Sequence, residues 1–189
     1  MKFTMASRWF IINEWLFSNL SNEKDSDQDS SETTDRRKEE SVQFLETLFV
    51  RKEDGIVVPR NCPWIRKAYQ WADRANRVGG RERNLSKRFF REVLLQPSRR
   101  IELEKDNLQE LPPELRRLIR TQKDDEIAEY INDEDEYLLL TWLSSPVQIE
   151  YIVTTDVGLQ DALARHFPAI RTRHRDDFLA EYLDNPPAQ

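Results

Sequence analysis

Acidic side chains stand beside apolar runs at three widely separated places in this chain. Glu14 follows the run at residues 9–12, Asp135 precedes the run at 137–140, and Asp156 ends the run at 151–155. Carboxylate oxygens are the ligands that Mg²⁺ and Mn²⁺ prefer, and a bound ion polarises phosphate and activates water. We therefore predict a Mg²⁺ or Mn²⁺ site in which Glu14, Asp135 and Asp156 are the metal-binding and catalytic residues.

The same residues have structural interpretations. Acids at 133–136 offset the dipole of a helix that begins there, Asp156 can cap a helix, and Glu14 can simply open one. With 35 Asp and Glu residues in the chain, chance clustering competes with a metal site. Asp156 favours function, because residues just beyond the carboxyl ends of buried parallel strands are where α/β sheets place ligands.

Other residue types that carry chemistry are sparse. The single cysteine, Cys62, excludes an intrachain disulfide and a cysteine-based zinc cluster, and its neighbours Pro63 and Trp64 favour a buried structural thiol over a nucleophile. His166 and His174 have no companion His or Cys at ligand spacing, which favours surface or packing roles. Four glycines in 189 residues make a glycine-rich phosphate loop implausible.

Composition sets the class of protein. A chain of 189 residues with 38% hydrophobic content suits one domain with a real core. The net charge of −6 argues against a protein that coats nucleic acid broadly, but it is compatible with a local binding site. No run reaches the roughly 18 apolar residues of a membrane span, and no signal-peptide pattern is present. We expect a cytoplasmic protein with no membrane association.

The pattern of apolar residues indicates alternating strands and helices, which favours an α/β fold with a mainly parallel central sheet. We expect a single domain over 1–189, with a flexible loop at 21–35 and a largely helical insertion at 60–123. The predicted strands cover 8–13, 56–59, 100–104 and 151–155. The predicted helices cover 14–20, 63–77, 85–95, 112–120, 124–131, 137–143 and 160–167, with another from residue 36.

Basic residues concentrate between positions 66 and 88, with Arg66, Lys67 and Arg74 among them, and aromatic residues are interleaved. Arginines and aromatics together suit single-stranded RNA, through phosphate pairing and base stacking. The competing interpretation is a pair of amphipathic helices with charged outer faces and aromatic inner faces. The interleaved aromatics are Trp64, Tyr69, Trp71 and Phe89.

Three of these segments together resemble the PIN-domain family of metal-dependent ribonucleases, which includes many bacterial toxins. Residues 135–143 resemble the family's acid-led helix, and 152–156 resemble its strand ending in Val-Thr-x-Asp. Residues 10–16 resemble its first strand, with Asn13 or Glu14 where the family has Asp. The resemblance implies a three-layer fold and the metal ligands already named. Residues 61–67 lack the family's next acid, so Glu46 or Asp161 replaces it, or the site has lost activity.

Three hypotheses follow. The first is a PIN-like, metal-dependent endoribonuclease, a toxin or defence effector that acts on single-stranded RNA and pairs with a protein partner or antitoxin. In it, Glu14, Asp135, Asp156 and Asp161 bind the metal, and Arg66, Lys67 and Arg74 bind the substrate. The second is a catalytically inactive PIN-fold protein-interaction module. The third is an unrelated α/β protein whose acids are solvated.

Overall fold

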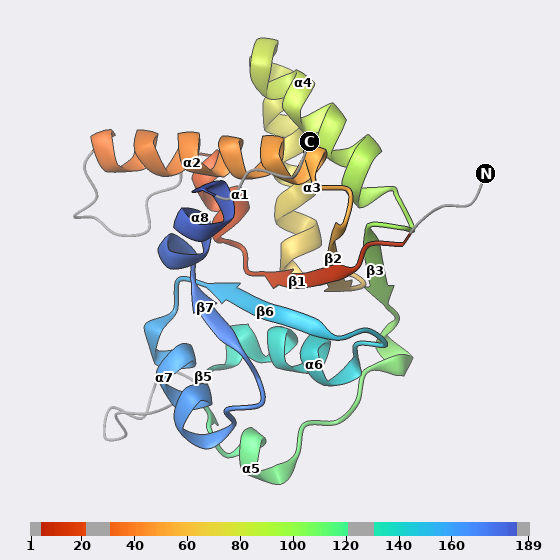
Figure 1. Ribbon diagram of the computed structural model, residues 1–189, viewed down its shortest axis with the longest axis vertical. Coiled ribbons are helices and arrows are strands. Elements are labelled where there is room, and N and C mark those ends of the chain that lie inside the picture. The colour runs from red at the N-terminus through yellow and green to blue at the C-terminus, as the bar shows by residue number, and fades with distance from the viewer. Residues whose placement is uncertain (1–4, 22–30, 121–130, 185–189) are drawn as a thin grey trace.

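A five-stranded, all-parallel sheet with strand order β3-β2-β1-β6-β7 forms the centre of the fold (Figure 1). The computed structural model describes residues 5–21, 31–120 and 131–184. The predicted α/β fold with a mainly parallel sheet is confirmed. The strands are β1 (Arg8–Ile12), β2 (Asp54–Pro59), β3 (Arg100–Leu103), β6 (Ile149–Thr154) and β7 (Thr172–His174).

Alternating side chains of the central strands enter two separate cores, one on each face of the sheet. Phe10 and Ile12 of β1 join one core, while Trp9 and Ile11 join the other. Each fully buried side chain of this size stabilises the fold by about 1.5–3 kcal/mol. Apolar residues at consecutive positions are therefore required, because both faces of the sheet are covered.

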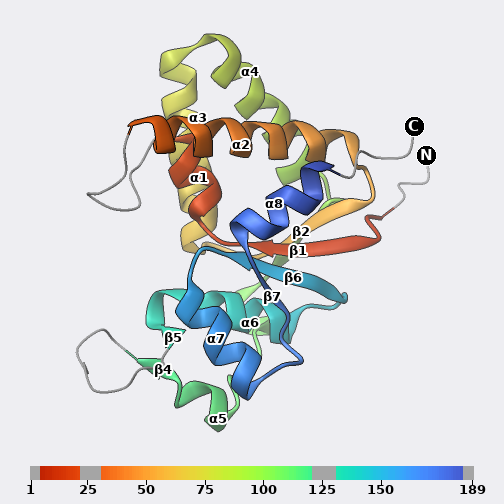
Figure 2. The same ribbon diagram turned by 60° about the vertical axis from the view of Figure 1, so that its left-hand side comes forward.

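Helices cover both faces, which makes three layers (Figure 2). The helices on one face are α1 (Trp15–Leu20), α2 (Ser31–Val50), α3 (Pro63–Val78), α4 (Gly80–Phe89) with the π-helix η1 (Phe90–Leu94), and α8 (Arg175–Asp184). The helices on the other face are α5 (Pro113–Arg116), α6 (Glu136–Ser144) and α7 (Val157–His166). Among the helices that the structure describes, none is long and apolar enough to cross a bilayer.

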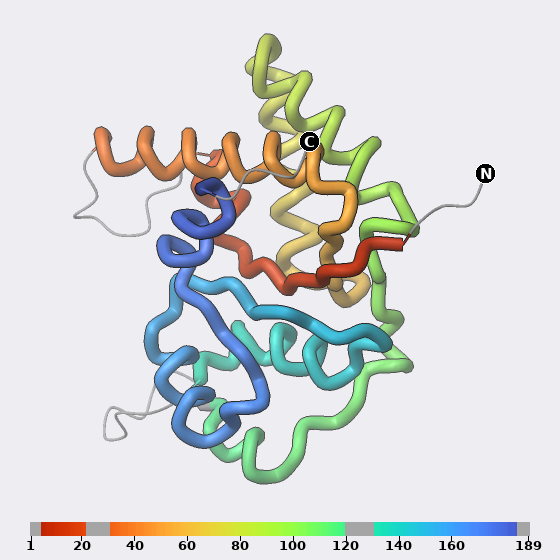
Figure 3. Tube along the Cα trace, viewed as in Figure 1, coloured from red at the N-terminus to blue at the C-terminus, as the bar shows by residue number. Residues whose placement is uncertain are grey.

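Smaller elements complete the chain path, which is traced in Figure 3. The 3-10 turn η3 leads directly into α6. The strands β4 and β5 pair with each other in parallel, apart from the central sheet. These two strands are β4 (Ile119–Arg120) and β5 (Ile131–Asn132). The 3-10 turns are η2 (Lys105–Asn107) and η3 (Asp133–Asp135).

Two of the predicted boundaries are wrong. The helix predicted for 112–120 ends at Arg116, because the following residues pair as β4 with β5. In the segment 21–35, predicted to be flexible, residues 31–35 form the first turns of α2 and Ser21 closes α1. Glu32 in the first turn of α2 favours that start through the helix dipole. Residues 22–30, and 124–130 of another predicted helix, lie outside the described residues.

The helices predicted for 63–77 and 85–95 form as α3 and as α4 with η1, and α3 and α4 pack side by side (Figure 3). Pro63 occupies the first turn of α3, as predicted from its fixed backbone angle. These helices connect β2 to β3, and β3 is an edge strand of the central sheet. These helices therefore form the connection between two neighbouring parallel strands of the sheet.

The strand order reverses direction between β1 and β6. The chain builds outward from β1 through β2 to β3, and then returns to place β6 and β7 on the other side of β1. In open α/β sheets, the crevice beyond the carboxyl ends of the strands at such a point is the usual ligand site. Here that crevice is flanked by Asn13 after β1 and Asp156 after β6.

Candidate functional site

Two aspartates come together beyond the carboxyl ends of β1 and β6. Asp135 is only 8% exposed at the start of α6, where its side chain makes no capping hydrogen bond. Asp156 precedes α7, and its Oδ1 accepts a hydrogen bond from the Leu159 backbone N–H at 2.9 Å. Burial, the charge of Asp156 and a hydrogen bond with Asp156 together raise the pKa of Asp135 to about 7. The Asp135 carboxyl group therefore takes up a proton close to neutral pH.

Asn13 holds Asp135 in place through its amide group. Its Nδ2 donates to Asp135 Oδ1 at 3.2 Å and to Thr154 Oγ1 at 3.3 Å. Its Oδ1 accepts from the Tyr137 hydroxyl at 2.9 Å and from the Glu14 backbone N–H at 2.5 Å. Both ends of the amide are used, so Asn13 ties β1 to the starts of α1 and α6 and fixes the orientation of the Asp135 carboxyl group.

Thr154 and Tyr137 support the site, and sequence reasoning gave neither a role. Thr154 is fully buried, and its Oγ1 accepts from the Asp156 backbone N–H at 3.0 Å. Burial raises the pKa of Tyr137 well above its ordinary value, which keeps its hydroxyl protonated as a donor to Asn13. Tyr137 lies in the segment 135–143, and Thr154 lies in 152–156. Membership of these two segments was the only feature of the sequence that could have indicated a role in the site.

Glu14 lies beside this pair, and its carboxylate is bound to a lysine. Lys67 Nζ of α3 is 3.0 Å from Glu14 Oε2, and it also donates to Ser18 Oγ at 3.1 Å. The negative charge of Glu14 makes a smaller contribution to the raised pKa of Asp135. In the part of the chain that the structure describes, no group of three or more His, Cys, Asp or Glu side chains is placed to hold a metal ion.

The donors that are present fit Mg²⁺ or Mn²⁺ in a simpler way. Mg²⁺ is commonly bound by one or two carboxylates, with waters and substrate phosphates as its other ligands. Asp135 and Asp156 supply two such carboxylates on rigid helix starts. Because Asp135 is partly protonated at neutral pH, binding of a divalent cation there would displace its proton. The pair therefore offers two carboxylates to such an ion, whereas the Glu14 carboxylate is paired with Lys67.

The other acidic residues considered for the site, and the cysteine, lie outside the pair. Asp161 is exposed on α7, and within the described residues no hydrogen bond or ion pair joins it to Asp135 or Asp156. Glu46 of α2 is 3.4 Å from Arg81. Burial raises the pKa of Cys62, which keeps it a protonated thiol as its structural interpretation requires.

Basic residues of α3 line two neighbouring hollows. Arg66 and Lys67 line one of about 520 Å³ together with Glu14 and Glu134, which brings positive charge to the edge of the acidic pair. Arg74 lines a second hollow of about 500 Å³. Gln70 lines both hollows, so they adjoin along the helix.

The aromatic residues interleaved with these basic residues are mostly core residues. Trp64, Trp71 and Phe89 are buried against one another, so the predicted stacking of bases on them is wrong. Tyr69 is 55% exposed, and its ring packs edge-on against Phe90. The competing interpretation, amphipathic helices with aromatic inner faces, is confirmed for these residues.

A third hollow, of about 680 Å³, lies beyond the carboxyl ends of β2 and β3. Tyr137 lines it with Lys105 and Arg60, and Pro63 lines both this hollow and the one beside Lys67. The two hollows therefore adjoin at Pro63, and each is lined by basic residues.

Comparison of the chain with protein-family models, with curated proteins and with solved structures found no match. The functional conclusion therefore depends on the fold and on the geometry of the site.

Proposed function

We propose that this protein is a PIN-like, metal-dependent nuclease that hydrolyses phosphodiester bonds in RNA. The observation that carries the proposal is the buried Asp135 beside Asp156 at the reversal point of the sheet. Placing the buried Asp135 carboxyl group beside a second carboxyl group is costly, since burial and the neighbouring charge both disfavour its ionised form. Such an arrangement is typical of a site that binds a cation or moves a proton.

Asp135 and Asp156 would hold Mg²⁺ or Mn²⁺ in this proposal. When bound there, the ion would act as a Lewis acid on the phosphate and lower the pKa of a water molecule. Asn13 positions Asp135 through the hydrogen bond at 3.2 Å. Thr154 positions Asp156 by accepting from its backbone N–H.

Lys67 and Arg66 would attract the phosphates of the substrate. They line the hollow that reaches Glu14 at the edge of the site, so a phosphate held there lies near the acidic pair. This local concentration of positive charge suits a chain whose overall charge is −6. A substrate phosphate that pairs with Lys67 would also release Glu14, which could then join the metal site.

The alternative function is a catalytically inactive PIN-fold protein-interaction module. The ion pair between Lys67 and Glu14 at 3.0 Å favours it, because this lysine neutralises the third carboxylate of the predicted site. Asn13 stands where the family resembled in the sequence has an acid, which reduces the negative charge further. In that case α3, with Tyr69 and Val78 exposed, would contact the partner.

Cleavage of a labelled single-stranded RNA by the purified protein, with Mn²⁺, with Mg²⁺ and with EDTA, separates the two functions. We expect cleavage that depends on the metal and is lost in Asp156→Asn. Asp177→Asn is the matched control, because it removes one exposed carboxylate on α8 by the same change. If the wild-type protein cleaves no RNA with either metal, the interaction module is the better conclusion.

A further inference from the structure

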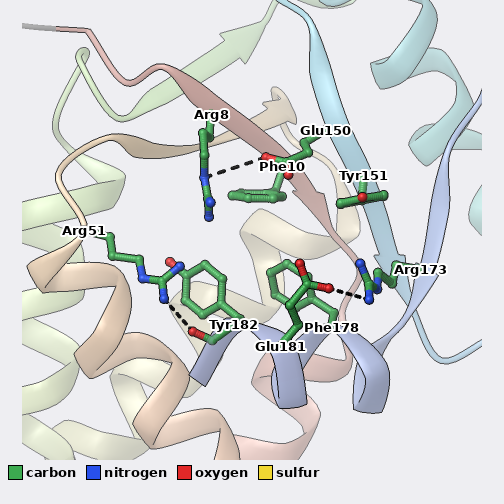
Figure 4. A pocket seen from close by; sticks show the side chains of 9 residues that line it. All are labelled: Arg8, Phe10, Arg51, Glu150, Tyr151, Arg173, Phe178, Glu181 and Tyr182. Atoms are coloured by element: carbon green, nitrogen blue, oxygen red, sulfur yellow. Dashed lines mark hydrogen bonds and ion pairs between the residues drawn. The ribbon is translucent and has the colours of Figure 1, made fainter. Parts of the chain in front are cut away.

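A cavity of about 160 Å³ lies between α8 and the central sheet, at the end of the strands opposite the acidic pair (Figure 4). Arg8 begins β1 and Asn13 follows it, so the two sites are roughly 16 Å apart along that strand. Three guanidinium groups line this cavity, those of Arg8, Arg51 and Arg173. Its other walls are aromatic rings and two carboxylates, from Phe10, Tyr151, Phe178, Tyr182, Glu150 and Glu181.

Two buried arginines of this region, Arg51 in the cavity wall and Arg99 behind it, donate to backbone carbonyls rather than to carboxylates. Arg51 is 5% exposed, and its Nη2 donates to the Tyr182 backbone carbonyl at 2.7 Å. Arg99 is 4% exposed, and it donates to the backbone carbonyls of Asp54, Leu48 and Arg51. Neutral carbonyls satisfy N–H groups but do not balance a buried positive charge, which is costly.

The nearest buried carboxylate is already used by other groups. Asp54 is fully buried, and its oxygens accept from Arg8 at 2.8 and 3.2 Å and from the Tyr182 hydroxyl at 2.6 Å. Asp54 is the fully buried carboxylate of this region, while Glu150 lies near Arg8 and the charges of Glu92 and Glu53 act on Arg99. Arg51 is the cavity arginine without an ion pair among the described residues, and an anion in the cavity would offset its charge.

Arg51 also has a donor without an acceptor. Its Nε is buried and has no hydrogen-bond partner among the described residues. The guanidinium lies over the Tyr182 ring, 4.2 Å from its centroid, so the ring holds the charged group in place as part of the cavity wall (Figure 4). A buried donor left unpaired is uncommon in folded proteins and needs an explanation. A ligand that brings negative charge to the cavity provides one.

We propose that this cavity binds a phosphate group, as free inorganic phosphate or as the phosphate of a small phosphomonoester. The three lining arginines come from β1, from the residue after α2, and from β7, so they approach from different elements. A tetrahedral phosphate has enough oxygen acceptors for three guanidinium groups, whereas a carboxylate has two oxygens. A cavity of roughly 150 Å³ holds a molecule of benzene, so the volume here suits one phosphate group.

The two glutamates of the cavity would regulate its affinity. Glu181 is 2.5 Å from Arg173, and Glu150 is 3.7 Å from Arg8, so both compete with an anion for the guanidinium groups (Figure 4). The Glu181 side chain is 56% exposed and can leave without disturbing the core. Removing the charge of Glu181 would leave the Arg173 guanidinium available to bind phosphate, and the affinity for phosphate would increase.

Isothermal titration calorimetry of the full chain with inorganic phosphate, in low-salt buffer, tests this site. We expect saturable binding of one phosphate, at least tenfold weaker in Arg173→Gln and about fivefold tighter in Glu181→Gln. Arg91→Gln is the matched control, since it removes an exposed guanidinium on η1 that pairs with Glu92. Circular dichroism of each variant checks that these surface changes leave the fold intact.

A parallel titration with adenosine 5′-monophosphate identifies the source of the phosphate. Tighter binding than inorganic phosphate would support a phosphomonoester whose organic part contacts the aromatic walls. Recognition of the phosphate alone would be supported if adenosine 5′-monophosphate binds with the same affinity as inorganic phosphate. It would also be supported if inorganic phosphate binds and adenosine 5′-monophosphate does not. The proposal is overturned if neither the wild-type protein nor Glu181→Gln binds phosphate saturably, or if Arg173→Gln and Arg91→Gln have the same effect.

Discussion

Replacement of Asp135 by asparagine should make the protein more stable, by an amount that grows with pH. Asparagine has nearly the same shape and can still accept the hydrogen bond from Asn13, but it carries no charge. In the wild-type protein, burial and the neighbouring Asp156 raise the pKa of Asp135 from 3.8 to about 7. Above pH 7 the folded protein must therefore hold an unfavourable buried charge that the variant lacks.

The pH window of this effect follows from the two protonation states. Below pH 3.8 both the folded and unfolded forms carry the proton, so Asp135 contributes nothing to the pH dependence. Between 3.8 and about 7 the folded form holds a proton that the unfolded chain has lost, so stability falls as pH rises. From pH 5 to 8 this loss is at most about 3 kcal/mol, from 1.36 kcal/mol per pKa unit.

Urea unfolding at pH 5, 6, 7 and 8 measures the effect in the wild-type protein, in Asp135→Asn and in Asp177→Asn. The stability difference between Asp135→Asn and the wild-type protein should increase by about 2–3 kcal/mol across this range. Asp177→Asn should follow the wild-type curve, because its carboxylate is exposed on α8. A difference for Asp135→Asn that stays constant with pH would refute a strained acidic pair at this site.

Three further predictions concern other parts of the chain. Tyr182→Phe removes a buried hydrogen bond of 2.6 Å to Asp54. The free energy of unfolding, measured in urea, should therefore fall by about 1–3 kcal/mol, and an unchanged value would contradict that hydrogen bond. Gly55→Ala would place a Cβ 2.5 Å from the Trp9 ring, and it should lower the melting temperature, with a loss of about 1–3 kcal/mol. Lys67→Gln should weaken RNA binding measured by fluorescence anisotropy and reduce its salt dependence; equal salt slopes would exclude a phosphate contact.

The sequence was sufficient to predict four strands of the central sheet and the ends of β1 and β6, but β7 was not among the predicted strands. The apolar runs before Asn13 and Asp156 are long enough to be buried on both faces, and such runs are typical of parallel strands. Asp156 was predicted to lie beyond a strand end, and it does. Its pairing with Asp135 could be expected because a helix start and a strand end meet at the same edge of the sheet.

The details of the site depend on contacts between residues that are distant in sequence. Nothing local indicates that Lys67 binds Glu14, because the contact requires α3 to pack against α1. The burial of Trp64 and Trp71 had a local signal, since they recur with Ala68 and Ala75 at helical spacing on one face of α3. The early end of α5 had no such signal, since strand pairing overrides local helix preference there.

Calorimetric titration of Mn²⁺ into the protein at pH 6.5, in two buffers of different ionisation enthalpy, tests the central claim most directly. The Asp135–Asp156 pair should bind one ion and release close to one proton, because the pair holds a proton at that pH. Asp156→Asn should lose this binding, whereas Asp177→Asn should keep it. Absence of Mn²⁺ binding, or binding of equal affinity in Asp156→Asn, would contradict a metal site at the carboxyl edge of the sheet.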